Sequence, residues 1–208
     1  FRCCHAVDNC CYGQTILSNT ARLMLAGVDE VGRGPLAGPV VTAAVILSPD
    51  DPYLGQYRDS KKVAEKKRLK LYHHIRKHAV AYSVNMASIE EIDQLNILHA
   101  TMLSMRRSVD GLSVTPSRVM VDGNRVPDLC VPAEAIIGGD DLVQEIAAAS
   151  ILAKVVRDRL MQRMDSQFPG YSFSKHKGYG TKVHMDALRA LGPCPAHRTS
   201  FAPIAKLL

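Results

Sequence analysis

The sequence predicts an α/β fold in which helices pack against a mixed β-sheet. Two apolar segments, Leu25–Val31 and Val40–Leu47, come first and flank a glycine-rich turn, as expected of two strands. Shorter apolar segments then alternate with helical patterns, an order typical of a mixed sheet covered by helices. The 208 residues, 47% of them hydrophobic and 22% charged, suit one domain with a substantial core.

The next part of the chain predicts a helix, a strand and a second helix. Lys61–His78 has the pattern of a basic helix, and Ala81–Ala87 that of a strand. Ser88 and Glu91 have the spacing of a capping box, which predicts that a helix begins there. Its expected buried stripe comprises Leu95, Leu98, Met102 and Met105.

The second half predicts two short strands, Arg118–Val121 and Ala135–Ile137, followed by helices. A long helix is expected over Leu142–Met164, with Leu142 among its buried residues. Its Ala147–Ser150 run is small enough to let the helix approach the sheet closely. Tyr171–Thr181 is rich in Gly and Lys and is expected to be a loop, and a last helix is expected after it. The C-terminal part is therefore predicted to be helical.

The charge and the apolar runs restrict the class of protein. There are 26 Lys and Arg against 20 Asp and Glu, a net charge of +6. This balance favours a polyanionic partner such as nucleic acid, although mildly basic proteins are common. No apolar run approaches the roughly 20 residues of a membrane-spanning helix, so no membrane association is expected.

Cysteine is concentrated at the start of the chain, where four of the six lie within the first eleven residues. Neither a zinc-ribbon spacing nor a distributed disulfide framework is present, and no secretory signal is evident, so a reduced, cytoplasmic protein is expected. Residues 1–23 are interpreted as a leader or disordered extension, and 24–208 as the catalytic domain. Deleting 1–23 is expected to leave folding and activity unchanged.

Acidic residues follow three of the predicted strands. Asp29 and Glu30 end the first, Asp122 ends a later one, and Asp140 follows another. If these strand ends meet at one edge of a sheet, the carboxylates would repel one another and favour a hard cation such as Mg²⁺ or Mn²⁺. Two such ions can activate a water and stabilise the leaving oxygen in phosphodiester cleavage. The alternative is that each acid caps a helix or begins a turn, and spacing alone does not decide between the two.

Six segments, in order from Leu25 to the C-terminal region, carry a resemblance to a known family. They are Ala26–Pro35, Asp59–Lys62, Leu95–Thr101, Asp122–Asn124, Ala148–Lys154 with Arg157 and Asp158, and His176–Thr181. Together they resemble the signature of the type 2 ribonucleases H, in particular bacterial ribonuclease HII. Six ordered motifs are far more specific than any one of them.

The resemblance implies a ribonuclease H-like fold and a metal site made of Asp29, Glu30, Asp122 and Asp140, with Mn²⁺ or Mg²⁺ as cofactor. It also implies an endonuclease that cuts RNA in RNA–DNA hybrids and at single ribonucleotides in duplex DNA. Cleavage in that family lies 5′ of the ribonucleotide and leaves 3′-hydroxyl and 5′-phosphate ends.

Several residues are expected to bind this substrate. By resemblance, the Gly32-Arg33-Gly34 loop recognises the ribose 2′-hydroxyl, and two glycines allow the backbone to approach a sugar closely. Tyr179 is expected to contact the deoxyribose after the ribonucleotide, although simple packing is the alternative for a loop tyrosine. Three residues, Ser60, Lys61 and Lys62, can donate hydrogen bonds to phosphates.

One position departs from the family pattern. Gly138 stands where the family usually has a Lys, and the adjacent Asp140 and Asp141 leave two candidates for the last catalytic acid. The separation from Asp122 favours Asp140, so Asp140→Asn is expected to abolish cleavage and Asp141→Asn to preserve it.

Two other functions fit part of the pattern. A binder of nucleic acid without catalysis could keep the scaffold, but the complete set of four acids argues against it. The related type 3 ribonucleases H carry an additional N-terminal domain, for which the segment before Met24 is expected to be too short. No motif indicates a protein partner, and a monomer is expected.

Overall fold

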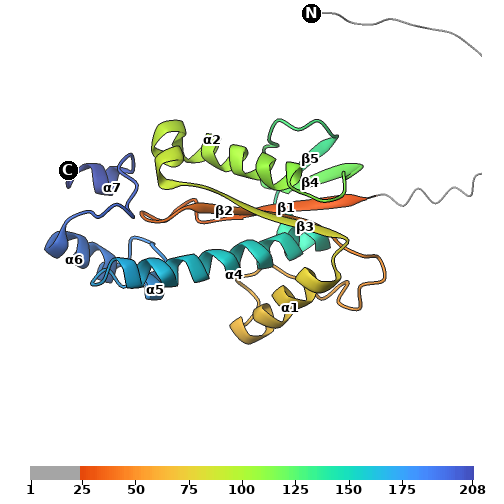
Figure 1. The fold of residues 1–208 in the computed structure, drawn as a ribbon, viewed down its shortest axis with the longest axis horizontal. Helices are drawn as coiled ribbons and strands as arrows, with labels where there is room; N and C mark the ends of the chain where they lie inside the picture. Colours follow the sequence, from red (N-terminus) through yellow and green to blue (C-terminus); the bar gives the residue numbers. More distant parts are fainter. Residues whose placement is uncertain (1–23) are drawn as a thin grey trace, which may run out of the picture.

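A five-stranded mixed sheet forms the centre of the fold in the computed structural model, which describes residues 24–208 (Figure 1). The strand order is β3-β2-β1-β4-β5. β1 pairs antiparallel with β2 and parallel with β4, so β1 lies at the centre and joins the antiparallel and parallel halves. The strands are β1 Leu25–Val31, β2 Val40–Ile46, β3 Ala81–Ala87, β4 Arg118–Asp122 and β5 Ala133–Ile136.

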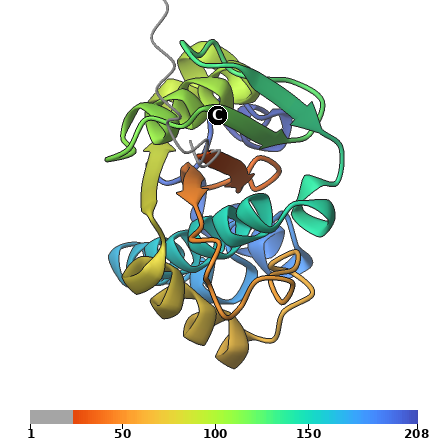
Figure 2. The same cartoon turned by 90° about the vertical axis from the view of Figure 1, so that its right-hand side faces the viewer.

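Helices cover both faces of this sheet, as the sequence predicted (Figures 1 and 2). α2 packs on one face, where Met105 and Val109 join a buried cluster with Val28 of β1. α4 and α1 cover the other face, where Ile151 and Leu152 belong to a second cluster. The helices are α1 Glu65–His78, α2 Ile89–Asp110, α3 Gly139–Leu142, α4 Gln144–Gln167, α5 Phe173–His176, α6 Lys182–Leu191 and α7 Ala202–Ala205.

The approach of α4 to β1 is close because both surfaces carry small residues. A Cβ added at Gly27 would lie 2.1 Å from the carbonyl carbon of Glu145. Ala147, Ala148 and Ala149 are fully buried at the same contact. The predicted role of the small-residue run is therefore confirmed, and α4 lies directly beside the strand that carries Asp29 and Glu30.

Some predicted boundaries and buried positions are wrong. The basic helix begins at Glu65, because Lys61 and Lys62 belong to a turn in which the Asp59 carboxylate accepts a hydrogen bond from the Lys61 amide. Leu95 is 40% exposed, since Asn96 adopts φ 65°, ψ 164° and kinks α2. Leu142 is 70% exposed.

The exposure of Leu142 has a backbone cause. Val143 is extended (φ −122°, ψ 124°), and it separates the short helix α3 from α4. The expected long helix is thus two helices, and its first expected core residue lies outside the second.

Other local predictions are confirmed. The Ser88 hydroxyl accepts a hydrogen bond from the Glu91 amide at 3.2 Å, and the Glu91 carboxylate accepts one from the Ser88 amide at 3.0 Å, which completes the capping box of α2. α5, α6 and α7 gather at one end of the molecule, so the C-terminal part is helical (Figure 1). The expected loop at Tyr171–Thr181 contains the short helix α5.

The interpretation of residues 1–23 as a leader or extension lies outside the described residues. Within 24–208, no helix combines the length and the apolar character needed to cross a membrane.

Candidate active site

Three acidic side chains meet where β1 and β4 run side by side. Val28 of β1 is paired with Val121 of β4, so the next residues along these parallel strands, Asp29 and Asp122, are neighbours. One carboxylate oxygen from each of Asp29, Glu30 and Asp122 lies within 4.8 Å of the others. The sheet register thus brings together acids that lie more than ninety residues apart in the sequence.

Asp29 is the most buried of the three, with 4% of its surface exposed. Burial, together with the charges of Glu30 and Asp122, raises the pKa of its carboxyl well above the ordinary value. Hydrogen bonds from the Ser150 hydroxyl and the Glu30 amide act in the opposite direction. Burial also raises the pKa of Glu30, whereas Arg33, at 3.4 Å, lowers it.

The donor chemistry of this cluster fits a divalent cation. Carboxylate oxygens are hard ligands of the kind preferred by Mg²⁺ and Mn²⁺. Burial and the repulsion among the acids raise the pKa values of Asp29 and Glu30, and the charge of a bound cation would act in the opposite direction. Asp29, Glu30 and Asp122 are therefore the residues that could hold a metal.

Asp140 lies beside this cluster but outside the group of three. The Gly139 amide donates a 2.8 Å hydrogen bond to the Asp122 carboxylate, which fixes the start of α3 against the end of β4. Burial, followed by the charges of Asp122 and Asp59, raises the pKa of Asp140. Asp141 is exposed and forms an ion pair with Lys62. Asp140 thus interacts electrostatically with the cluster, whereas Asp141 pairs with Lys62.

The Gly32–Gly34 loop lies next to the acids, and the Tyr179 ring lies next to the loop. Arg33 reaches back to Glu30, and a Cβ added at Gly34 would lie 3.7 Å from Cε1 of Tyr179. Gly32 is buried, whereas Arg33, Gly34 and Tyr179 are exposed. The structure therefore brings these predicted substrate-binding residues to one surface beside the carboxylates.

The other predicted phosphate-binding residues differ in accessibility. Ser60 is only 3% exposed, and its hydroxyl hydrogen-bonds that of Ser150 at 2.9 Å. Lys61 is exposed, and Lys62 is held by Asp141. The Ser60 side chain thus connects the turn to Ser150 of α4, while Lys61 and Lys62 are both exposed.

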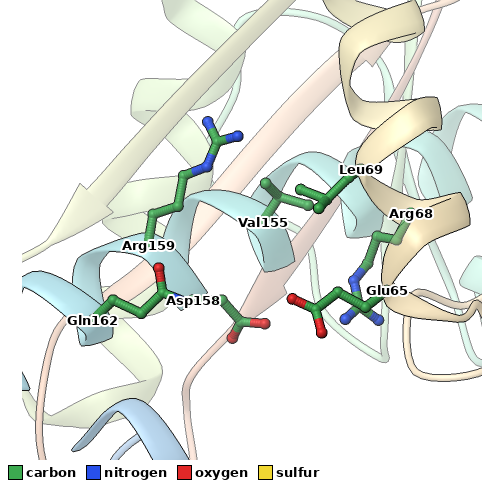
Figure 3. A pocket seen from close by; sticks show the side chains of 7 residues that line it. All are labelled: Glu65, Arg68, Leu69, Val155, Asp158, Arg159 and Gln162. Carbon is green, nitrogen blue, oxygen red and sulfur yellow. The ribbon is translucent and has the colours of Figure 1, made fainter.

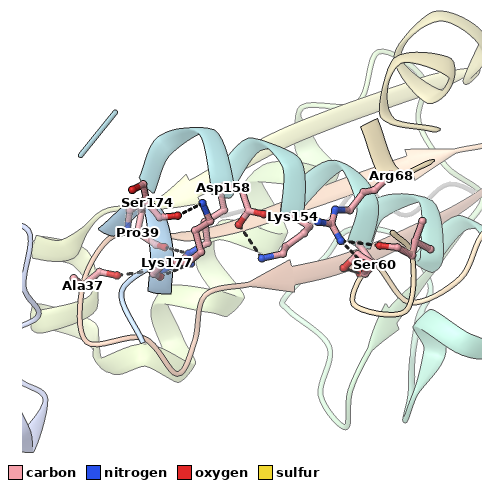
Figure 4. A network of polar contacts seen from close by, with 11 residues as sticks. Ala37, Pro39, Ser60, Arg68, Lys154, Asp158, Ser174 and Lys177 are labelled. Atoms are coloured by element: carbon pink, nitrogen blue, oxygen red, sulfur yellow. Dashed lines mark hydrogen bonds and ion pairs between the residues drawn. The ribbon is translucent and has the colours of Figure 1, made fainter. Parts of the chain in front are cut away.

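Sequence reasoning missed two buried arginines behind the loop, Arg157 and Arg198. Arg157 of α4 donates hydrogen bonds to the carbonyls of Ala37, Pro39 and Lys177. These three acceptors lie together beside α4 (Figure 4). Arg157 belongs to one of the six sequence motifs, but nothing in the sequence indicated that it is buried without an acidic partner in residues 24–208.

A cavity of about 170 Å³ lies elsewhere, between α1 and α4 (Figure 3). Glu65 and Arg68 of α1 line it together with Asp158 and Arg159 of α4, and the carboxylates of Glu65 and Asp158 point towards one another. It contains none of the predicted site residues, and its two acids balance its two arginines. The carboxylate cluster is therefore separate from this cavity.

Comparison with known proteins gives a consistent result. A model of the family described as ribonuclease HII matches residues 26–204. The fold is similar to ribonuclease H2 from Pyrococcus horikoshii OT3, with a TM-score of 0.73 and 24% identity over 88% of this chain and 96% of that chain.

Two further solved structures are similar. Ribonuclease HII from Archaeoglobus fulgidus, solved in complex with PCNA, has a TM-score of 0.68 and 26% identity over 86% of this chain and 95% of that chain. Bst-RNase HIII, solved in complex with Mn²⁺, has a TM-score of 0.62 and 19% identity over 89% of this chain and 69% of that chain. The predicted fold class is confirmed by these similarities.

Proposed function

The chain belongs to the ribonuclease HII family, and from this premise we propose that it nicks duplex DNA 5′ of a single embedded ribonucleotide. Family membership makes it a ribonuclease H, an endonuclease that hydrolyses the RNA strand of RNA–DNA hybrids. The proposal concerns the finer substrate, the catalytic residues and the metal mechanism. The observation that carries it is the Gly32–Gly34 loop, which lies between the carboxylate cluster and the Tyr179 ring.

Four acids are assigned to catalysis and metal binding: Asp29, Glu30, Asp122 and Asp140. Their oxygens would hold two Mg²⁺ or Mn²⁺ ions, which supply activation of a water and stabilisation of the leaving oxygen. The Glu30 amide orients the Asp29 carboxylate, and the Gly139 amide orients that of Asp122. The side chains position the metal ions and supply the negative charge that binds them. The products carry 3′-hydroxyl and 5′-phosphate ends.

Recognition of the substrate is assigned to the loop and the residues around it. The backbone of Gly32, Arg33 and Gly34 contacts the ribose 2′-hydroxyl, which distinguishes RNA from DNA. The exposed Tyr179 ring lies against the following deoxyribose. Contacts to the phosphates are assigned to Lys61, Lys62 and the turn that contains Ser60.

A labelled DNA duplex with one ribonucleotide tests this function in Mg²⁺, in Mn²⁺ and in EDTA. We expect a metal-dependent nick immediately 5′ of the ribonucleotide, and none with Asp29→Asn. Binding without nicking in either metal would favour the non-catalytic binder instead. Cutting of long hybrids but not of the single ribonucleotide would contradict the role of the loop and Tyr179.

The choice between the adjacent acids is tested with a matched pair of variants. Asp140→Asn is expected to abolish nicking, because the Asp140 carboxyl interacts electrostatically with Asp122 of the cluster. Asp141→Asn is expected to retain it, because Asp141 is exposed and bound to Lys62. The reverse result would move the assignment to Asp141.

The proposal also covers the boundaries and the assembly. Residues 24–208 are taken as the catalytic domain of a cytoplasmic monomer that acts without a partner protein. A chain lacking 1–23 is expected to keep the nicking rate and to elute as a monomer in gel filtration. Loss of activity on this deletion would show that the first 23 residues belong to the enzyme.

A further inference from the structure

Arg198 is a buried cation behind the Gly32–Gly34 loop. It is 0% exposed, and in residues 24–208 it forms no ion pair with an acid. It donates hydrogen bonds to three carbonyls: Gly32 at 2.6 Å, Arg33 at 2.8 Å and Gly38 at 2.7 and 2.9 Å. Burial lowers its pKa to about 9, so it remains protonated at neutral pH. A buried charge without an ion-pair partner is costly, and neutral hydrogen-bond donors would be enough to hold an ordinary turn. The charge of Arg198 therefore points to a role beyond holding the turn.

Two of these carbonyls determine the direction of the loop amides. All peptide bonds of the described chain are trans, and in a trans peptide the carbonyl and the N–H point in opposite directions. Because Arg198 draws the carbonyls of Gly32 and Arg33 inward, the N–H groups of Arg33 and Gly34 point outward. Neither amide donates to another group of residues 24–208, and both residues are exposed.

The loop can adopt this arrangement only with glycine at position 32. Gly32 has φ +97°, and a Cβ there would lie 2.1 Å from Nε of Arg157. The two arginines thus support the loop from beneath, one against its α-carbon and the other through its carbonyls. The outward side carries two successive amides, an arrangement that binds anions and oxygen atoms.

The bound guanidinium also strengthens these amides as donors. A peptide group whose carbonyl accepts a charged hydrogen bond is polarised, which makes its N–H a better donor in a low-dielectric environment. The outward amides lie between Glu30, which pairs with Arg33, and the Tyr179 ring. A nucleotide oxygen bound there would therefore sit beside the carboxylate cluster.

We propose that Arg198 is a positioning residue for ribose recognition, which sets the preference for a ribonucleotide over a deoxyribonucleotide through the Gly32–Arg33 and Arg33–Gly34 peptide groups. The inference rests on the proposed function, because it assigns the 2′-hydroxyl oxygen as the acceptor of these amides. Arg198 itself touches no substrate atom. Its effect is transmitted through the backbone, so it must appear in substrate preference and not only in stability.

Competition kinetics on the single-ribonucleotide duplex in Mg²⁺ test this inference. The KM reports how well the ribonucleotide duplex binds, and the inhibition constant of an unlabelled all-DNA duplex of the same sequence reports how well the deoxy form binds. The preference for the ribonucleotide is the inhibition constant divided by the KM. In Arg198→Lys we expect this ratio to fall about tenfold, equivalent to ~1.4 kcal/mol, through a higher KM and an unchanged inhibition constant.

Arg107→Lys is the matched control, since Arg107 pairs with Glu91 on α2 and contacts no loop carbonyl. It is expected to keep the wild-type ratio. A folded Arg198→Lys protein with an unchanged ratio would overturn the inference. If the wild-type protein does not nick this duplex, the proposed function fails instead, so the two failures are distinguishable.

A second measurement covers the case in which Arg198→Lys does not fold. Amide resonances of wild-type Arg33 and Gly34 are followed by NMR in EDTA while either duplex is added. We expect both resonances to shift with the ribonucleotide duplex and to shift less with the all-DNA duplex. Equal shifts with the two duplexes would contradict the assignment of the 2′-hydroxyl to these amides.

Discussion

Replacing Asp29 by Asn is expected to stabilise the metal-free protein. Asp29 is buried, and its carboxylate lies within 4.8 Å of those of Glu30 and Asp122. Two unit charges at this separation repel by about 3.5 kcal/mol at an effective dielectric constant of ~20. Two such neighbours give about 7 kcal/mol in total, which solvent, relaxation and partial protonation reduce. We expect a net gain of ~1–3 kcal/mol in the free energy of unfolding, since an Asn oxygen can still accept the hydrogen bond of the Glu30 amide.

The pH dependence of this gain follows from the raised pKa of Asp29. The unfolded carboxyl loses its proton near the ordinary value of 3.8, whereas the folded one retains it to higher pH. Wild-type stability therefore falls as the pH rises from 3.8 through the folded pKa, and the Asn variant escapes this loss. The difference between the two proteins should vanish at low pH and be complete above the folded pKa.

Urea unfolding in EDTA, followed by circular dichroism at several pH values, measures this difference. Addition of Mg²⁺ or Mn²⁺ should reverse the order, because the wild-type site gains binding energy that the variant lacks. An Asn variant less stable than the wild type in EDTA at pH 8 would refute the reasoning. It would mean that hydrogen bonds to Asp29, and not repulsion among the acids, dominate the metal-free site.

Three further predictions concern stability. Burial lowers the pKa of His184 to about 4 and also lowers that of His197, so these side chains take up protons in the unfolded chain before they do so in the folded one as the pH falls. The free energy of unfolding should therefore drop by up to about 3 kcal/mol for His184 between pH 6.5 and 4. The His184→Gln variant should show a smaller drop in urea unfolding. Gly27→Ala should lower the free energy of unfolding by ~3 kcal/mol or more in the same assay, because the added Cβ would collide with the α4 backbone. The control Gly55→Ala, at φ +80° with open space around the added Cβ, should lower it by only ~1–2 kcal/mol. Equal losses in the two variants would contradict this prediction. Ser88→Ala should cost ~1 kcal/mol through loss of the capping box, and thermal unfolding should show no change if the cap is unimportant.

The strands were predictable because their signal is local. β1 and β3 have the predicted bounds, since an apolar run between turn residues is read from a few neighbouring positions. The meeting of Asp29 with Asp122 was predictable only conditionally. It depends on the parallel pairing of β1 with β4, a contact between distant segments that no local pattern encodes.

Errors arose where a single backbone angle interrupts a periodic pattern. The apolar spacing that includes Leu95 continues through Asn96 in the sequence, but the kink at that residue turns Leu95 towards solvent. Likewise, Leu142 fits the stripe of α4 until Val143 becomes extended. Periodicity assumes constant helical geometry, and neither residue type requires a break.

The support of the substrate loop could not be predicted because it comes from the far end of the chain. Arg198 lies 166 positions from Gly32, whose carbonyl it binds. The sequence shows an arginine in the C-terminal region, and a basic residue there is ordinarily a solvated one. Only the folded chain reveals that it is buried and forms no ion pair with an acid of residues 24–208. The same contact connects the C-terminal part of the chain to the site, because the segment after α6 contributes the Arg198 guanidinium that binds the loop carbonyls. Truncation before Arg198 should therefore reduce ribonucleotide preference even though all four candidate metal-binding acids remain.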